Sequence, residues 1–362
     1  MNSYYNQLQT TFRKLSNEKL NENTAFIDGS VIYGSSFADM DHLLDHENGH
    51  LRRTLFNGQA FPPFSEQAIY DQIYRRFKEV DLFEARKIVG AQMQVIAYRD
   101  WLPILLGSDL APYGGYDPGV DPSISVEFAF GAMRVGHALL RDKTLHATSD
   151  GRQSALPTED DVLRIEKVLF DGGVDTFLNG LMGMSIKRPQ FLSPSITERI
   201  FGGMDLGAIN IQRARDAAVS SYNEARSLCS LSKASTFNDL SSGISNPETR
   251  SMMEKLYASP DDIDLYVGLL SEDPSSGLLG PTSACLIADQ FKRLRDGDRF
   301  FFKNPGIFTN DQLIEIEKTS LSKIICDNAD RISLIGTDAF SLSSSQVPCD
   351  RLPTIDLTKW EE

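Results

Sequence analysis

Apolar side chains recur at helical spacing along most of this chain. Residues 82, 85, 89, 93 and 96 are apolar and share one helical face, which predicts a long helix that ends near Pro103 and Gly107. Strand patterns are few and short, and residues 108–122 and 141–157 are predicted loops. The pattern therefore predicts a mainly α fold. Further helical segments are expected over residues 67–80, 125–140, 159–182, 203–229, 281–296 and 311–327, with short helices and turns over 230–280.

The segment 125–140 reads as one buried helix that carries a single histidine, His137. Arg134 lies three residues earlier and so shares the face of His137. A lone histidine in an apolar helix is more often a satisfied core or surface residue than a ligand. The alternative is that His137 binds the face of a large cofactor.

Composition limits the possible classes of protein. The chain has 362 residues, of which 41% are hydrophobic, enough for one large domain or two unequal ones. A net charge of −14 argues against a nucleic-acid binder, which needs a basic face. No run of eighteen apolar residues predicts a membrane span. Residues 1–20 form a polar arm without the apolar core of a signal peptide.

Two further groups of residues allow alternative interpretations. The four cysteines lie outside Cys-x-x-Cys spacing, which disfavours zinc and leaves either buried thiols or two disulfides. Residues 24, 26, 28 and 30 alternate in an extended segment, so their oxygen atoms could face one side, as calcium requires. An ordinary Asp-Gly turn is the commoner meaning of such a segment. The histidines at 42, 46 and 50 share a helical face, but their charged surroundings favour a solvated surface over a metal site.

Eight segments of the chain, in order from about residue 21 to 360, resemble the animal haem peroxidases of the myeloperoxidase, thyroid peroxidase and peroxidasin type. These segments read TAFIDGSVIYGSS, EARKIVGAQMQVIAYRDWLPILLG, MRVGHALL, DLGAINIQRARD, YNEARSLC, GPTSACLIADQFKRLRDGDRFFF, SLSKIICDN and LPTIDLTKW. The resemblance implies a helical peroxidase domain over residues 21–362, incomplete at its N-terminal side.

The resemblance implies roles for individual residues at a haem b site. His137 matches the proximal iron ligand, and Asn210 matches the acceptor of its other ring N–H, which fixes the tautomer. Arg134 and Arg213 match positions near the haem propionates. Arg134 stands three residues from His137, and Arg213 stands three residues from Asn210. Each helix would therefore present one cation to a propionate carboxylate.

The resemblance also implies a second cofactor and a covalent framework. Thr24, Phe26, Asp28 and Ser30 match a calcium loop, weakened because only one acidic ligand remains. The implied disulfides pair Cys229 with Cys285 and Cys326 with Cys349, each expected to constrain the unfolded chain by about 3–4 kcal/mol. An extracellular location is implied by the family.

The distal catalytic residues of the family are not found in this sequence. No Gln-x-x-Asp-His motif precedes residue 24. Glu66, at most a remnant of the family's Arg-x-x-Glu motif, has no arginine three residues before it. The family's Arg-Asp-His-Gly reads Arg215-Asp216-Ala217-Ala218. Peroxide cleavage needs a distal base and a cation, and the loss of either typically lowers the rate by about a hundred- to a thousandfold.

Two functions follow as hypotheses. The first is a haem peroxidase that uses hydrogen peroxide to oxidise a small or tyrosine-like donor, for example in oxidative stress. The second is a catalytically inactive homologue that acts as an extracellular interaction module. A shortened distal side would expose apolar surface, so oligomerisation is also expected.

Overall fold

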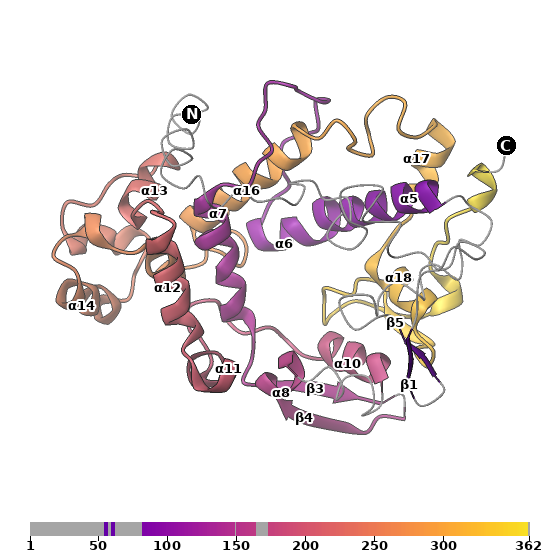
Figure 1. Ribbon diagram of the computed structural model, residues 1–362, viewed down its shortest axis with the longest axis horizontal. Coiled ribbons are helices and arrows are strands. Elements are labelled where there is room, and N and C mark those ends of the chain that lie inside the picture. The colour runs from indigo at the N-terminus through magenta and orange to yellow at the C-terminus, as the bar shows by residue number, and fades with distance from the viewer. Residues whose placement is uncertain (1–53, 57–58, 62–81, 149, 164–172, 361–362) are drawn as a thin grey trace. The chain divides into compact units, whose positions relative to one another are not determined.

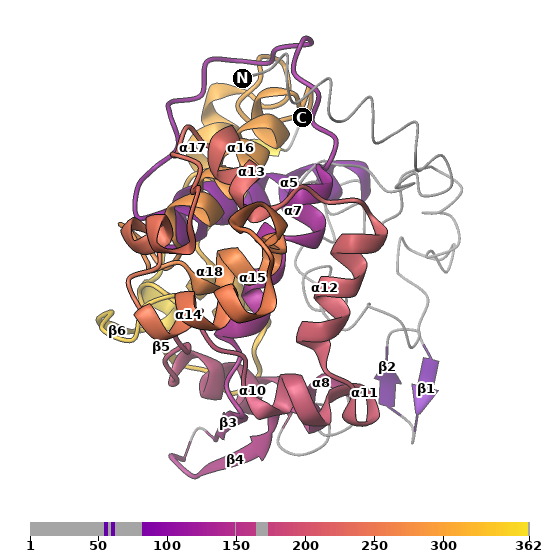
Figure 2. The same ribbon diagram turned by 90° about the vertical axis from the view of Figure 1, so that its left-hand side faces the viewer.

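The structure is a computed structural model that describes residues 54–56, 59–61, 82–148, 150–163 and 173–360. Helices dominate these residues, and the strands form three two-stranded antiparallel hairpins (Figures 1 and 2). The prediction of a mainly α fold is therefore confirmed. The chain divides into two compact units, the first with described residues 102–111 and 123–292, and the second with the remainder.

The first unit contains the elements between Leu102 and Lys292. They are α6 (Leu102–Leu106), α7 (Val126–Phe130), η2 (Ala132–Leu139), β3 (Lys143–Ala147), β4 (Gln153–Pro157), α8 (Thr158–Leu163), α10 (Gly173–Met182), η3 (Ser195–Arg199), α11 (Ile200–Gly203), α12 (Leu206–Asp216), α13 (Tyr222–Leu228), η4 (Phe237–Ser242), α14 (Pro247–Leu256), η5 (Pro260–Asp262), α15 (Leu265–Ser271) and most of α16 (Pro281–Asp296).

The second unit combines helices from both ends of the described sequence. Its elements are β1 (Thr54–Phe56), β2 (Gln59–Phe61), α5 (Leu82–Val95), η1 (Ile96–Trp101), the end of α16, α17 (Asn310–Ile316), α18 (Leu321–Asn328), β5 (Leu334–Gly336), β6 (Gln346–Pro348), η6 (Cys349–Arg351) and η7 (Leu357–Trp360). The predicted long helix over 82–107 is thus a continuous run of α5, the π-helical η1 and α6.

The prediction of one helix over 125–140 is wrong. The segment consists of α7, capped by Ser125, whose hydroxyl accepts from the Phe128 amide at 3.2 Å, and the separate 3₁₀ helix η2. The break falls at Gly131, where an added Cβ would lie only 2.5 Å from Leu265 Cδ2. The Glu127 carbonyl oxygen would lie 2.7 Å from the same Cβ, so the crowding from α7 and α15 together favours glycine here. Because a 3₁₀ helix has three residues per turn, residues three apart are eclipsed on one face.

The prediction of a polar loop over 141–157 is also wrong, since β3 and β4 form a hairpin there. Its turn contains Gly151, whose φ of +85° favours glycine, so the Asp-Gly dipeptide was the overlooked signal. His146 on β3 is buried, and its Nε2 lies 3.1 Å from both carboxylate oxygens of Asp161 on α8. In Figures 1 and 2 the hairpin lies beside α8 and α10, which it contacts.

Local capping divides the segment 311–327, which was predicted as one helix, and separates two helices within the helical segment 203–229. Residues 311–327 form α17 and α18, since Thr309 and Gln312 make a reciprocal capping box and Ser320 caps the second helix. Residues 203–229 form α12 and α13, capped by Asp205 and Ser221. The predicted end of α16 at Asp296 is confirmed.

A buried polar network and a disulfide hold the N-terminal end of α16. Glu272 accepts from the Thr282 amide at 2.9 Å and from the Tyr222 hydroxyl at 2.9 Å, and Arg226 lies 3.9 Å away. Burial raises the pKa of Glu272, although these hydrogen bonds oppose the shift. The disulfide Cys229–Cys285 joins the end of α13 to α16.

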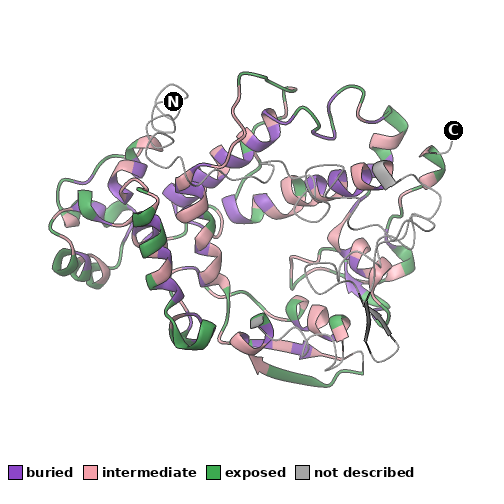
Figure 3. Ribbon diagram, in the orientation of Figure 1, coloured by how far each residue is buried: buried purple, intermediate pink, exposed green. Residues whose placement is uncertain are grey.

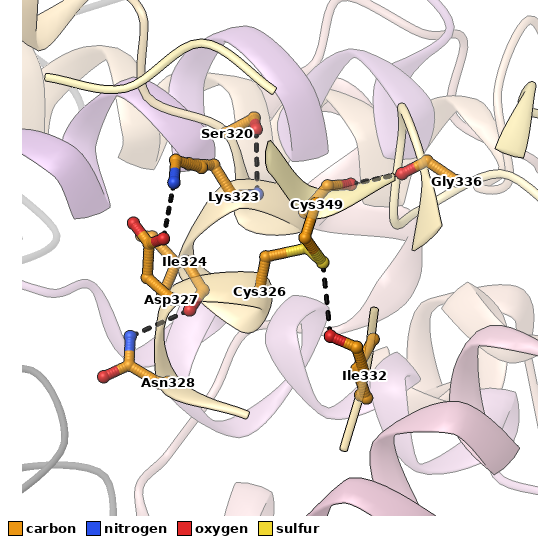
Figure 4. The surroundings of a disulfide bond; sticks show 10 residues. Ser320, Lys323, Ile324, Cys326, Asp327, Asn328, Ile332, Gly336 and Cys349 are labelled. Atoms are coloured by element: carbon orange, nitrogen blue, oxygen red, sulfur yellow. Dashed lines mark hydrogen bonds and ion pairs between the residues drawn. A yellow bond between two sulfur atoms is a disulfide. The ribbon is translucent and has the colours of Figure 1, made fainter. Parts of the chain in front are cut away.

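The second unit has its own apolar core and disulfide. Ile88, Ala91 and Val95 on α5 pack with Phe301, Phe302, Phe308 and Ile316. The disulfide Cys326–Cys349 joins α18 to η6, and Cys349 Sγ lies 3.3 Å from the Ile332 carbonyl oxygen (Figure 4). Both disulfides that the resemblance implies are therefore present.

Helix α12 ends in a left-handed residue. The Val219 amide donates to the Ala214 carbonyl, and the Ala218 amide donates to the Arg215 carbonyl, both at 3.0 Å. This is a Schellman motif, which places Ala218 at a φ of +51°, where a Cβ is strained.

We expect Ala218→Gly to raise the free energy of unfolding by about 0.5–1 kcal/mol, because glycine adopts this conformation without strain. The matched control is Ala217→Gly, where φ is −86° and glycine should lower stability instead. Chemical denaturation of both variants checks this, and equal destabilisation by the two substitutions would contradict it.

Glu272 should make stability depend on pH. Its raised folded pKa means that the folded state binds more protons than the unfolded state above about pH 4.5, so stability should fall as pH rises through the folded pKa. Glu272→Gln mimics the neutral form of this side chain. Its free energy of unfolding should therefore rise relative to that of the wild type as the pH increases through the folded pKa of Glu272. Parallel plots of unfolding free energy against pH for the two proteins would contradict this assignment.

Candidate functional site

Four polar side chains from three helices of the first unit meet at η2. Arg134 and His137 share a face of η2, while Asn210 comes from α12 and Tyr266 from α15. Both α12 and α15 pack against the segment formed by α7 and η2. The buried residues of α12 recur at helical spacing (Figure 3), and Asn210 is among them with no exposed surface.

The Asn210 side-chain amide contacts both residues of η2. Its Oδ1 accepts from Arg134 Nη1 at 2.8 Å, and its Nδ2 lies 2.9 Å from His137 Nδ1. Arg134 also donates through Nε to the Ala129 carbonyl at 3.1 Å, and its guanidinium lies 5.2 Å from the centre of the Phe130 ring. His137 and Asn210 are therefore in contact, and their roles as iron ligand and acceptor stay predictions.

The imidazole of His137 has the properties of a metal ligand. Burial, assisted by the positive charge of Arg134, lowers the pKa of His137 below 6.5, so the ring is neutral near pH 7. Its Nδ1 is engaged by Asn210, whereas its Nε2 has no hydrogen-bond partner among the described residues. Nε2 is thus the ring nitrogen that no described residue engages.

Arg134 and Arg213 place two positive charges near each other. Arg213 is exposed on α12, one turn after Asn210, and the described residues offer neither arginine an acidic partner. Burial lowers the pKa of Arg134, and the charge of Arg213 lowers it further. Two neighbouring cations without a carboxylate partner fit an anionic ligand beside His137.

An ion pair fixes α12 against α15. Arg215 donates through Nε and Nη2 to the two oxygens of Asp264 at 2.8 and 2.7 Å, and the Tyr257 hydroxyl donates to Asp264 at 2.9 Å. Asp264 directly precedes α15. This bidentate contact helps to hold Tyr266 next to Asn210.

The surroundings of His137 fit the proximal side of a haem. Met133 in η2 and Leu140, the residue directly after η2, are 43% and 40% exposed, so this segment leaves apolar surface open to a ligand. One neutral imidazole with a fixed second nitrogen, together with nearby cations for carboxylates, is the donor set that haem requires. Among the described residues, no group of three or more His, Cys, Asp or Glu side chains is arranged to hold a metal ion.

Several sites considered from the sequence lie outside the described residues. They are the calcium loop of Thr24, Phe26, Asp28 and Ser30, the histidines His42, His46 and His50, and Glu66. Of the described histidines, His146 is engaged with Asp161 in the β3–β4 region. No helix within the described ranges is long and apolar enough to cross a membrane.

The sequence did not predict that Tyr266 belongs to this site. It lies 56 residues after Asn210 in the chain, and no spacing within one helix relates the two residues. Only the packing of α15 on α12 and η2 brings its hydroxyl to the amide of Asn210.

Comparison with solved structures supports the fold. Peroxidase A from Dictyostelium discoideum aligns with a TM-score of 0.75 at 24% sequence identity, covering 87% of this chain and 70% of that structure. A fatty acid alpha-dioxygenase from Oryza sativa aligns with a TM-score of 0.69 at 18% identity, covering 89% of this chain and 67% of that structure. At these identities, the likeness concerns the fold alone.

Sequence comparison is more specific. The chain is 41% identical to the peroxidase mlt-7 of Caenorhabditis elegans over 95% of its length, and 42% identical to the human peroxidasin homolog over 77% of its length. It spans 54% and 20% of the lengths of these relatives. A family model described as animal haem peroxidase matches residues 2–83 and 71–340. The chain therefore belongs to the animal haem peroxidase family.

Proposed function

We propose that the chain is a haem-dependent peroxidase that oxidises small or tyrosine-like donors with hydrogen peroxide. The observation that carries this proposal is the neutral His137, held at Nδ1 by the buried Asn210 and open at Nε2. Membership of the animal haem peroxidase family supports it.

In this proposal His137 would hold the iron of haem b through Nε2. Asn210 would fix the ring and its tautomer through Nδ1, since a ligating histidine needs a partner for its second nitrogen. A carboxamide is a weaker acceptor than a carboxylate, so Asn210 would increase the basicity of the ligand less than an aspartate would.

Arg134 and Arg213 would bind the haem propionates by charge-assisted hydrogen bonds. Burial, and further the charge of Arg213, lower the pKa of Arg134, and the two negative charges would offset both effects. Met133 and Leu140 would cover apolar parts of the macrocycle.

Bound haem would supply the iron at which peroxide is reduced and the donor is oxidised. The described residues would act on the proximal side of the haem. His137 would bind the iron, Asn210 would orient the His137 ring, and the two arginines would balance the charge of the propionates. We further propose a weakened calcium site at Thr24, Phe26, Asp28 and Ser30 and an oxidising, extracellular location, which the two disulfides support.

A second candidate function is an inactive homologue that acts as an extracellular interaction module. It is favoured by the engagement of His146 with Asp161, which leaves no other histidine among the described residues to serve as a distal base. The two functions differ in one property: the inactive homologue would bind haem without using peroxide.

Haem titration should give a histidine-ligated ferric Soret spectrum at one haem per chain, and His137→Ala should abolish that spectrum because it removes the axial nitrogen. The matched control His42→Ala should bind as the wild type does. Equal haem spectra for wild type and His137→Ala would contradict the ligand assignment.

The same complex separates the two functions. Under the peroxidase proposal, addition of hydrogen peroxide and a phenolic donor gives donor oxidation that His137→Ala loses. A stoichiometric, histidine-ligated haem complex that oxidises no donor would favour the inactive homologue instead.

Arg213→Gln should weaken binding of haem by about tenfold, because one charge-assisted hydrogen bond to a propionate is lost at an exposed position. The loss should shrink to less than about twofold for haem dimethyl ester, whose propionates carry no charge. The control is Arg188→Gln, at an exposed arginine on the loop after α10. An equal loss for both haems would place Arg213 away from the propionates.

A further inference from the structure

A buried tyrosine hydroxyl lies beside the amide of Asn210. Tyr266 is only 1% exposed, and its hydroxyl makes no hydrogen bond of standard geometry to a described residue. Burial raises the pKa of Tyr266 to about 12, while the neighbouring Asn210 amide and Arg134 charge oppose the shift. Buried hydroxyls are normally paired, so this hydroxyl needs an explanation.

The polar groups of Asn210 define the tautomer of His137. Because Arg134 donates to Oδ1, the group that faces His137 Nδ1 is the Nδ2 donor. His137 Nδ1 must then accept, which places the ring proton on Nε2. A histidine in that tautomer cannot bind iron through Nε2.

Ligation therefore requires the Asn210 amide to turn over, so that Oδ1 accepts from a protonated Nδ1. After this rotation Asn210 Nδ2 takes the place of Oδ1 in front of Arg134 Nη1. Both groups are hydrogen-bond donors, so they cannot pair. Arg134 must then leave Asn210 and donate to another acceptor. A haem propionate would be that acceptor, and this step rests on the proposed function. The buried Nδ2 then needs a new acceptor.

Tyr266 can serve both orientations. A hydroxyl donates as well as accepts, so it can donate to Oδ1 in one orientation and accept from Nδ2 in the other. Arginine can only donate, and among the described residues the amide's other hydrogen-bonding contact is with the histidine itself. We propose that Tyr266 is a positioning residue whose hydroxyl accepts from Asn210 Nδ2 and so keeps Asn210 Oδ1 on His137 Nδ1–H when His137 ligates iron.

The test compares Tyr266→Phe with the wild type in the haem complex of the full chain. The readouts are the iron–histidine stretching frequency of the ferrous complex by resonance Raman, the midpoint potential and haem affinity. Without the hydroxyl, Nδ1–H is held less firmly, so the frequency should fall, the potential should rise and haem affinity should fall about two- to tenfold. The matched control is Tyr222→Phe, at a fully buried tyrosine that donates to Glu272 instead.

A double-mutant cycle tests whether Tyr266 acts through Asn210. In an Asn210→Ala background, Tyr266→Phe should no longer shift the frequency, because the positioned group is gone. An unchanged frequency in Tyr266→Phe, or an equal shift with and without Asn210, would overturn this inference alone. Absence of His137-dependent haem binding in the wild type would overturn the proposed function and this inference with it.

Discussion

The buried amide of Asn210 is the contact on which the arrangement at η2 depends. It joins η2 to α12 through His137 and Arg134, and it lies beside Tyr266 of α15. A fully buried amide must satisfy both its donor and its acceptor, so a change at one neighbour alters the demands on the others. His137, Arg134, Asn210 and Tyr266 therefore form one coupled set.

Two contacts fix the helices around this amide. Gly131 allows Leu265 to approach the break between α7 and η2, and the bidentate pair of Arg215 and Asp264 fixes α12 to α15. The same fold occurs in peroxidases and in fatty acid alpha-dioxygenases, so the fold alone does not choose the reaction. The proposed function depends instead on His137, Asn210 and the two arginines, and membership of the animal haem peroxidase family supports it.

Much of this arrangement could be predicted from the sequence, and the rest depends on tertiary contacts. Helical spacing identified the region of η2, and the i, i+3 spacing of Arg134 and His137 gave their shared face. The spacing could not show the break at Gly131, where the distant Leu265 packs against the glycine. The β3–β4 hairpin was missed although Gly151 marked its turn, and the role of Tyr266 depends on packing that no local pattern records.

A structure of the haem complex tests the central claim most directly. The account predicts iron on His137 Nε2, Asn210 Oδ1 within hydrogen-bond distance of Nδ1, and the Arg134 guanidinium on a propionate. Iron bound to another residue, or Arg134 still on Asn210 with His137 unligated, would contradict it.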